Sequence, residues 1–315
     1  MKYKDAGVDI DRSNDFTSKL RKTFGNAIGS FGGTFNFKNS TLVASTDGIG
    51  TKLTLEIKYR RMNNAAQDLV AMNVNDISCM GAKPLFFLDY IGCHKIDNSI
   101  LEPFIESLKS VLDSLNCNLL GGETAEMPSV YPKGTFDMVG FVVGEIKTPD
   151  GKPLGSEKVK VGDAVIALPS SGLHSNGYTL VNKLIADGLL DVSNTALIDA
   201  LLTPTILYVF EPMEGIHACA HITGGGLIEN LPRVIPKRMR VDFEIGNVPE
   251  VFKWIQKAGN ISDGEMLRTF NMGTGFALIV DQKEVKNIMN GLRDFNPRIA
   301  GRVFENETGS NLRFR

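Results

Sequence analysis

Residues 45–52 read Ser-Thr-Asp-Gly-Ile-Gly-Thr-Lys and follow an apolar run at 41–44, Thr-Leu-Val-Ala, that is typical of a strand. The two glycines allow positive φ and let backbone N–H groups approach an anion. The acid suits a hard cation, and the threonine and lysine suit phosphate oxygens. The full Walker spacing is absent, so a polar hairpin turn is the alternative interpretation. The stretch predicts a phosphate and magnesium site made by Asp47, Gly48, Gly50, Thr51 and Lys52.

The composition is that of an ordinary globular protein, with 43% hydrophobic and 22% charged residues. At about 150 residues per domain, the length predicts two domains. A formal net charge of -2 gives no electrostatic signal for binding nucleic acid or an anionic membrane. The four cysteines show no ligand spacing, and no apolar run approaches the ~18 residues of a membrane span. We therefore expect a cytoplasmic protein with reduced, mostly buried thiols and no zinc, nucleic-acid or membrane partner.

Strand and helix patterns recur in both halves of the chain and predict an α/β (α+β) fold with two mixed sheet-plus-helix domains, 1–160 and 161–315. Residues 1–40, with a glycine-rich run at 25–33, are predicted to form a mobile flap, and a disordered arm is the alternative. The further predicted strands are 85–91, buried on both faces, 118–120, 136–146, 164–168, 276–281 and 298–304. The predicted helices are 64–80, 101–115, 178–186, 204–214, 226–231, 249–257 and 282–292.

Acids gather in the predicted loops and helix of the first half. Asp47 ends a strand, Glu123 follows Gly121 and Gly122 after another strand, and residues 75–76, Asn-Asp, lie on the polar side of the helix over 64–80. Mg²⁺ is usually bound through one or two carboxylates plus substrate phosphates. As a set these acids favour Mg-nucleotide, although each one alone could be a helix cap or an exposed charge.

Two loops of the second half each combine a histidine with glycines and hydroxyls directly before a predicted helix. They are 171–177, Ser-Gly-Leu-His-Ser-Asn-Gly, and 221–226, His-Ile-Thr-Gly-Gly-Gly. Backbone N–H groups at a helix N-terminus attract anions. His174 or His221 could transfer a proton or bind phosphate, and a turn-stabilising hydrogen bond is the alternative for either. His94 and His217 are expected to be structural.

Six segments in this order resemble aminoimidazole ribonucleotide synthetase, also called phosphoribosylformylglycinamidine cyclo-ligase, of purine biosynthesis. The segments, which extend over nearly the whole chain, are 3–10 (Tyr-Lys-Asp-Ala-Gly-Val-Asp-Ile), 47–52, 74–76, 121–128, 171–177 and 221–226. The resemblance implies a synthetase fold unrelated to ATP-grasp and a homodimer, in which the N-terminal sheets of two copies join into a β-barrel. It also implies that ATP and Mg²⁺ bind the first domain and that the ribonucleotide lies toward the second.

The resemblance implies roles for individual residues. The metal would be held by Asp47, Asp76 and Glu123. Nucleotide contacts would come from Asp47, Gly48, Gly50, Thr51, Lys52, Asn75, Gly121 and Gly122. The substrate and its phosphate would meet Ser171, Gly172, His174, Ser175, Asn176, Gly224, Gly225 and Gly226. The catalytic candidates are His174, His221 and Lys52.

The reaction implied by the resemblance converts formylglycinamidine ribonucleotide to aminoimidazole ribonucleotide, with release of ADP and phosphate. ATP would phosphorylate the formyl amide oxygen, and the ring would then close intramolecularly with a large proximity advantage. One alternative keeps the fold but changes the phosphoryl acceptor, as in selenophosphate synthetase or thiamine monophosphate kinase. The selenium enzymes use a reactive Cys in the N-terminal loop, whereas the first cysteine here is Cys79. The other alternative is a non-catalytic nucleotide-binding dimer.

Overall fold

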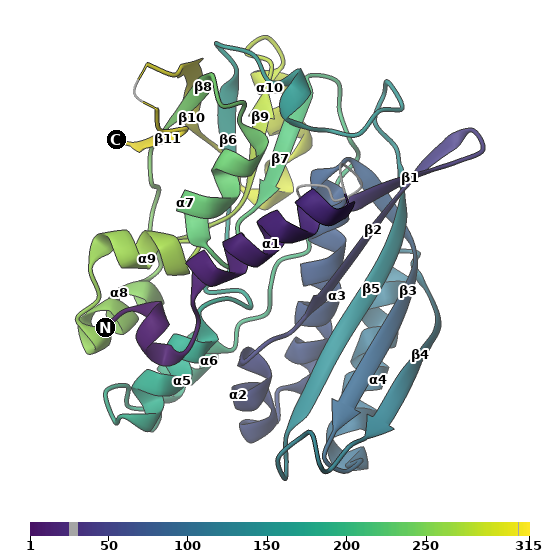
Figure 1. Cartoon of the computed structure of the whole chain (residues 1–315), viewed down its shortest axis with the longest axis vertical. Helices are drawn as coiled ribbons and strands as arrows, with labels where there is room; N and C mark the ends of the chain where they lie inside the picture. Colours follow the sequence, from purple (N-terminus) through teal and green to yellow (C-terminus); the bar gives the residue numbers. More distant parts are fainter. Residues whose placement is uncertain (25–30, 308) are drawn as a thin grey trace.

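The chain forms two mixed sheets, one in each half, and each sheet is flanked by helices (Figure 1). A computed structural model describes residues 1–24, 31–307 and 309–315. The first sheet has the strand order β1-β2-β5-β3-β4, and the second has the order β11-β8-β10-β6-β9-β7. The predicted α/β architecture with two sheet-plus-helix units is therefore confirmed. The boundary placed between residues 160 and 161 stays a prediction.

In the part of the chain that the structure describes, helices cover one face of the first sheet only (Figure 1). Phe87 of the sheet, Leu69 and Phe104 are fully buried in the core between that face and α3 and α4 (Figure 1). The other face, called here the open face, leaves Phe35 67% exposed and Phe141 37% exposed. The strands are β1 (Gly33–Phe37), β2 (Ser40–Gly48), β3 (Ala82–Cys93), β4 (Asn118–Glu126) and β5 (Phe136–Ile146). The helices are α2 (Lys52–Lys58), α3 (Met62–Cys79) and α4 (Asn98–Ser114).

Two expectations for this sheet were wrong. The apolar run in β3 is buried on one face only, because the side chains on its other face lie on the open face of the sheet. The strand predicted at 118–120 continues to Glu126, so the expected glycine loop belongs to β4, which pairs in parallel with β3 along Phe86–Cys93. Backbone pairing with a neighbouring strand outweighs the low strand propensity of glycine.

The second sheet has helices against both faces. One core packs Leu227 and Leu231 against the sheet, and the other packs Ile288 and Leu292 against it. The strands are β6 (Ala164–Pro169), β7 (Ile216–His221), β8 (Met239–Phe243), β9 (Thr274–Val280), β10 (Arg298–Glu305) and β11 (Leu312–Phe314). The α-helices are α5 (Tyr178–Ala186), α6 (Thr195–Leu201), α7 (Gly226–Asn230), α8 (Glu250–Gly259), α9 (Asp263–Thr269) and α10 (Val285–Gly291). Short 3-10 helices are η3 (Ser156–Lys158), η4 (Leu231–Val234) and η5 (Arg293–Phe295).

Residues 202–208, called here the bridging segment, run without regular structure along α3 of the first half. The helix predicted over 204–214 was therefore wrong. Side chains of α3 take the place of helical hydrogen bonds: Asn64 Nδ2 donates to the carbonyl of residue 202 at 2.6 Å, and Gln67 Nε2 donates to that of residue 205 at 2.8 Å. Because α3 already supplies hydrogen-bond partners to the backbone of this segment, helix formation would add no hydrogen bonds to those groups.

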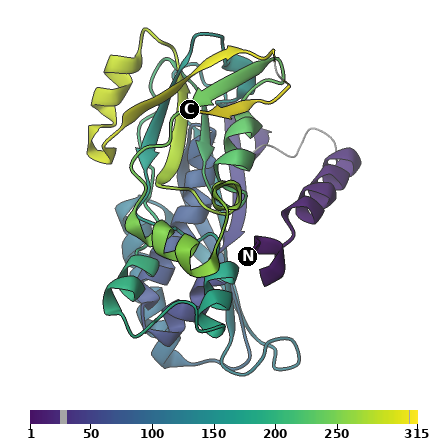
Figure 2. The ribbon, with the colours of Figure 1, turned by 90° about the vertical axis from the view of Figure 1, so that its left-hand side faces the viewer.

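The N-terminal segment is more regular than expected. It forms η1 (Tyr3–Ala6) and α1 (Ile10–Phe24), and α1 lies at the edge of the molecule (Figure 2). It contacts the second half, where Arg268 pairs with Asp11. Periodic apolar positions are few before residue 40, and α1 and β1 (Gly33–Phe37) nevertheless form there, which rules out the alternative of a disordered arm for these residues. Residues 25–30 of the predicted flap lie outside the described residues.

The four cysteines are reduced and buried, as predicted. Cys79, Cys93, Cys117 and Cys219 are buried free thiols, and burial raises the pKa of the Cys117 thiol to about 11. Such thiols are poor nucleophiles. Among the described residues, no helix combines the length and the apolar character needed to cross a membrane.

Candidate active site

The end of β2 brings two carboxylates together under α3. The backbone N–H of Asp47 donates to Asn73 Oδ1 at 2.9 Å, and Ser45 Oγ donates to Asp76 Oδ2 at 3.3 Å. Burial, and then the charge of Asp76, raise the pKa of Asp47 to about 7. A bound cation stabilises the charged form of a carboxylate, such as Asp47, whose ionisation is opposed by burial and by a neighbouring acid. Two carboxylates also match what Mg²⁺ commonly takes from a protein when substrate phosphates supply other ligands, so these residues fit the implied metal.

Glu123 does not join this pair within the chain. Asp47 lies opposite Gly140, and Asp89 lies opposite both Gly140 and Gly122, so these four share one row of the sheet and one face. Glu123 follows in the strand, and its side chain therefore points to the open face, with β5 and β3 between β4 and β2. The described residues contain no group of three or more acids, histidines or cysteines that could hold a metal. The structure thus brings Asp47 and Asp76 together and leaves Gly121, Gly122 and Glu123 at the far edge.

His221, at the end of β7, connects the second half to these acids. Its ring is fully buried, with Nδ1 3.0 Å from Asp76 Oδ1 and Nε2 3.4 Å from Asn75 Nδ2. Asn75, on the polar side of α3, is also fully buried. This side of α3 faces the second half.

His174 lies in the loop between β6 and α5 and is also fully buried. Its φ of 60° is unusual for a residue with a side chain and marks a strained backbone. Burial, and then the nearby His221 and Lys52, lower the pKa of His174 well below its ordinary value, so the ring is neutral at pH 7. Nε2 accepts from the N–H of Ser171 at 3.3 Å, which puts the ring proton on Nδ1. That Nδ1–H finds no hydrogen-bond partner among the described residues.

The two glycine-bearing loops of the second half meet. A side chain at Gly224 would begin 3.5 Å from Asn176 Oδ1. Gly226 has a φ of 58°, and a Cβ there would lie 2.1 Å from the carbonyl oxygen of Leu267, so only glycine fits. Asn230 Nδ2 donates to three carbonyls of the loop over 223–226 and holds its shape. Asn176 Nδ2, like His174 Nδ1, is a buried donor without a partner in the described part of the chain.

Three other predicted substrate residues make contacts within the protein. Ser171 Oγ donates to the carbonyl of Pro204 at 2.6 Å, and Ser175 Oγ lies 3.3 Å from Thr205 Oγ1. The carbonyl of Gly172 accepts from a side-chain amide at 2.8 Å. The two serine contacts attach the loop over 171–177 to the bridging segment, and the amide that binds Gly172 is that of Asn271. They place its backbone rather than exposing its hydroxyls.

Lys52 corrects the expectation that its ammonium group meets a phosphate. The side chain is fully buried, with Nζ 2.6 Å from Asp68 Oδ2 and 2.9 Å from the carbonyl of Thr203, and it lies over the ring of Tyr178. Sequence reasoning missed Asp68 and Glu56 as the surroundings of this lysine. The sequence contained one signal for this ion pair, which was the position of Asp68 on the polar side of the predicted helix over 64–80. The pair itself could not be predicted, because Lys52 and Asp68 belong to different helices.

The turn before Lys52 is not the polar hairpin turn of the alternative interpretation. β2 ends at Gly48 and α2 begins at Lys52, so the stretch is a strand-to-helix turn and not a hairpin. Gly50 has a φ of 71°, which favours glycine. The Thr51 hydroxyl lies 3.0 Å from that of Thr179 and so faces the second half.

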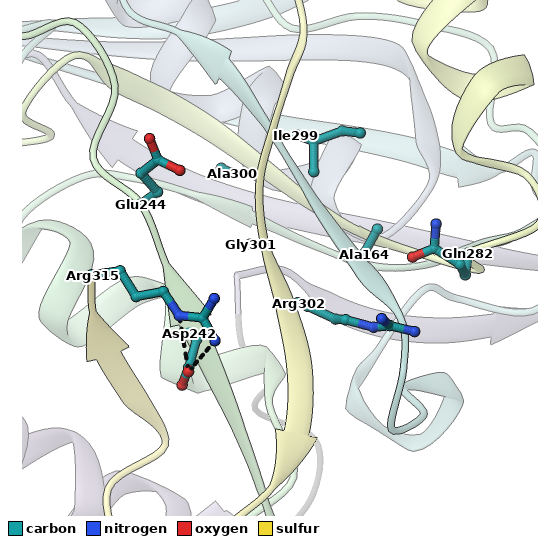
Figure 3. Close-up of a pocket in the computed structure, with 9 residues that line it drawn as sticks. All are labelled: Ala164, Asp242, Glu244, Gln282, Ile299, Ala300, Gly301, Arg302 and Arg315. Carbon is teal, nitrogen blue, oxygen red and sulfur yellow. Dashed lines mark hydrogen bonds and ion pairs between the residues drawn. The ribbon is translucent and has the colours of Figure 1, made fainter.

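A hollow of about 270 Å³ lies elsewhere, on the second sheet around β6, β8 and β10 (Figure 3). Arg315 and Arg302 are among its lining residues, and Arg315 donates to Asp242 at 2.8 and 3.1 Å (Figure 3). None of the predicted site residues lines it. We therefore place the candidate site at the acids and loops between the two halves.

The structural neighbours show the fold. Thiamine monophosphate kinase from Aquifex aeolicus superposes with a TM-score of 0.67 at 17% identity, covering 95% of each chain. Thermotoga maritima PurL complexed with ADP gives a TM-score of 0.59 at 14% identity, covering 91% of this chain and 43% of that one. At such low identity these matches carry no information on the reaction.

The sequence comparisons show the family. The family described as AIR synthase related protein matches residues 32–146 with its N-terminal domain and residues 160–310 with its C-terminal domain. The phosphoribosylformylglycinamidine cyclo-ligase of Geotalea daltonii is 43% identical over 98% of this chain and 96% of its own length. That of Caldanaerobacter subterraneus is 41% identical over 98% and 99%. A trifunctional purine biosynthetic protein of Homo sapiens is 39% identical, and the chain covers 34% of its length. The chain belongs to the AIR synthase related family and, within it, to the phosphoribosylformylglycinamidine cyclo-ligases.

Proposed function

We propose that the chain is an ATP-dependent cyclo-ligase that converts formylglycinamidine ribonucleotide to aminoimidazole ribonucleotide in de novo purine biosynthesis. Membership of the cyclo-ligase family over nearly the full length supports the reaction. The observation that carries the placement of the site is the contact from Asp76, beside Asp47, through His221 to the second half. A ligase that transfers a phosphoryl group from ATP to a ribonucleotide needs a cation site for ATP next to an anion site for the ribonucleotide.

The nucleotide side of the proposed site is the acid pair. Asp47 and Asp76 would hold Mg²⁺ together with the phosphates of ATP. When bound, Mg²⁺ neutralises the charge that moves during phosphoryl transfer. Gly50 leaves open space at the turn, whereas Gly48 packs against the carbonyl of Met138. Lys52 is assigned to the protein interior because its partners are Asp68 and Thr203.

The ribonucleotide side of the proposed site is the pair of loops in the second half. His174 Nδ1 and Asn176 Nδ2 are donors without partners in the described chain, and both would donate to anionic oxygens of the substrate. Burial lowers the pKa of His174, so its ring is neutral near pH 7 and would bind the substrate as a neutral hydrogen-bond donor through Nδ1. Gly224 and Gly225 keep the neighbouring surface free of side chains.

The proposed reaction has two covalent steps. The formyl oxygen attacks the γ-phosphorus of ATP, and ADP leaves. The amidine nitrogen then attacks the formyl carbon, the oxygen departs as phosphate, and the nitrogen loses a proton to the medium or to a protein group. Holding both reacting ends of one substrate between the two halves supplies the proximity advantage of an intramolecular closure.

We also propose that the protein is a cytoplasmic homodimer formed through the open face of the first sheet. Phe35 is 67% exposed, Phe37 51% and Phe141 37%, and large apolar side chains gathered on one face are typical of an interface. Joining the open faces of two copies would produce the β-barrel that the family resemblance implies. Glu123 lies on this same face.

The test is an assay of purified protein with ATP, Mg²⁺ and formylglycinamidine ribonucleotide, with ADP measured and the imidazole product identified. We expect Asp47→Ala to abolish ATP-dependent phosphate release without changing the circular dichroism spectrum. Asp113→Ala, which removes an exposed carboxylate of α4, is the matched control and should keep full turnover. Near-normal turnover of Asp47→Ala would overturn the metal assignment, and nucleotide binding without any product would indicate a binding protein.

A further inference from the structure

We infer that Asn75 is a positioning residue, which fixes the position of the ring proton of His221 and, through His221, the placement of the Asp76 carboxylate. The inference rests on the proposed function only in assigning Asp76 to the metal. It revises the expectation that His221 transfers a proton to the substrate, and it gives the bridging segment a part in the chemistry.

The orientation of the Asn75 amide is determined by backbone groups. The N–H of Tyr208 donates to Asn75 Oδ1 at 2.8 Å, and Asn75 Nδ2 donates to the carbonyl of Ile206 at 2.8 Å. A backbone N–H can only donate and a carbonyl can only accept, so the amide cannot be turned over without losing both bonds. Because Asn75 is fully buried, no solvent could replace them.

The oriented amide then determines where the ring of His221 carries its proton. Asn75 Nδ2 is a donor only, and it faces His221 Nε2 at 3.4 Å. Nε2 must therefore be the unprotonated nitrogen, and the proton lies on Nδ1, which faces Asp76 Oδ1 at 3.0 Å. Both ring nitrogens are thus engaged by the protein. His221 acts on Asp76 and not on the substrate.

The Asp76 carboxylate is held from both halves of the chain as a result. Oδ1 accepts from His221 of β7, and Oδ2 accepts from Ser45 of β2 at 3.3 Å. Groups that orient a metal ligand in this way typically change metal affinity 10–100-fold when they are altered. Since Asn75 takes its orientation from residues 206–208, the acid pair is correctly placed only when the bridging segment is seated on α3.

The tautomer can be measured directly by NMR of protein labelled with ¹⁵N in its histidine rings. A His221→Gln variant assigns the signals by removing those of that ring. We expect wild-type His221 to carry its proton on Nδ1. In Asn75→Asp the new carboxylate cannot donate, and we expect a proton on Nε2 of His221. Asn64→Asp makes the same change on the same helix, also loses a donor to the bridging segment, and should leave His221 unchanged.

A titration with Mg²⁺ in the presence of ADP, followed by calorimetry, gives a second readout. We expect affinity for Mg²⁺ to fall about 10–100-fold in Asn75→Asp and to stay unchanged in Asn64→Asp. A wild-type ring protonated on Nε2, or a ring unaffected by Asn75→Asp, would overturn the inference. The wild-type spectrum decides the tautomer even if Asn75→Asp fails to fold. Absence of product in the ligase assay, with the expected tautomer present, would count against the proposed function and leave the role of Asn75 standing.

Discussion

Asp47 links the site to the pH dependence of stability. Its pKa is raised from 3.8 to about 7, by burial first and then by Asp76. The folded state therefore binds this proton more tightly than the unfolded state does, so the stabilisation is complete below about pH 4 and is lost as the pH rises toward 7. Without divalent cations, we expect the free energy of unfolding of the wild type to fall more steeply between pH 4 and 7 than that of Asp47→Asn. Urea denaturation at several pH values measures this, and parallel curves would contradict it.

Lys52, Asp68 and Glu56 form a buried charged cluster between the two halves. Burial, and then the charge of Asp68, raise the pKa of Glu56 well above its usual range and favour its protonated form, while Lys52 and Asp68 pair. We expect Glu56→Gln to change the free energy of unfolding by less than about 1 kcal/mol, because glutamine resembles the protonated acid. Asp68→Asn should cost about 3–5 kcal/mol by leaving Lys52 buried and unpaired. Equal losses in the two variants, measured by denaturant unfolding, would refute this assignment of charge.

At the scale of elements, the pairing of α3 with the bridging segment explains why the helix predicted over 204–214 does not form. The polar side of α3 binds the backbone of this segment. In the structure each satisfies the other: Asp68 Oδ1 accepts from the backbone N–H of Thr205 at 2.7 Å and also from its hydroxyl. Amide and carboxylate side chains along one helix face thus serve as the hydrogen-bonding partner of an extended backbone.

This pairing can be tested with two isosteric substitutions. Thr205→Val removes a buried hydroxyl that donates to Asp68, and we expect it to lower the free energy of unfolding by about 1–3 kcal/mol. Thr203→Val is the control, because its hydroxyl donates to the carbonyl of Asp199 at an exposed helix end and should matter by less than about 0.5 kcal/mol. If thermal or denaturant unfolding gave equal losses, the bridging segment would not be held chiefly by α3.

At the scale of the whole molecule, the open face of the first sheet has no helix packed against it among the described residues. Phe141 lies opposite Thr46 and Leu88 in the middle of that sheet. We expect the wild type to sediment as a dimer and Phe141→Glu to sediment as a monomer, because a charge would be buried in the interface. Ile299→Glu, a similar change at a residue 55% exposed on the second sheet, should remain dimeric. A monomeric wild type in analytical ultracentrifugation would contradict the proposed dimer.

Local patterns were sufficient for much of the architecture. The apolar periodicity of 101–115 predicted α4, the strand predicted over 136–146 is β5, and the start of α5 at Tyr178 followed from the polar loop before it. The motifs also pointed to Asp47 and Asp76 and to the loops that carry His174 and His221. These features depend on side chains close together in sequence, whose pattern is visible without the fold.

Other features depend on contacts between distant parts of the chain. Lys52 does not face the predicted phosphate site, because its ammonium group binds Asp68 and the carbonyl of Thr203. Glu123 lies apart from Asp47 and Asp76, because the register of β3 and β4 directs its side chain to the open face. The tautomer of His221 depends on Asn75, which in turn depends on backbone groups more than 130 residues away. Composition and periodicity carry no trace of such pairings, because a buried polar group is satisfied by whichever donor or acceptor the folded chain brings to it.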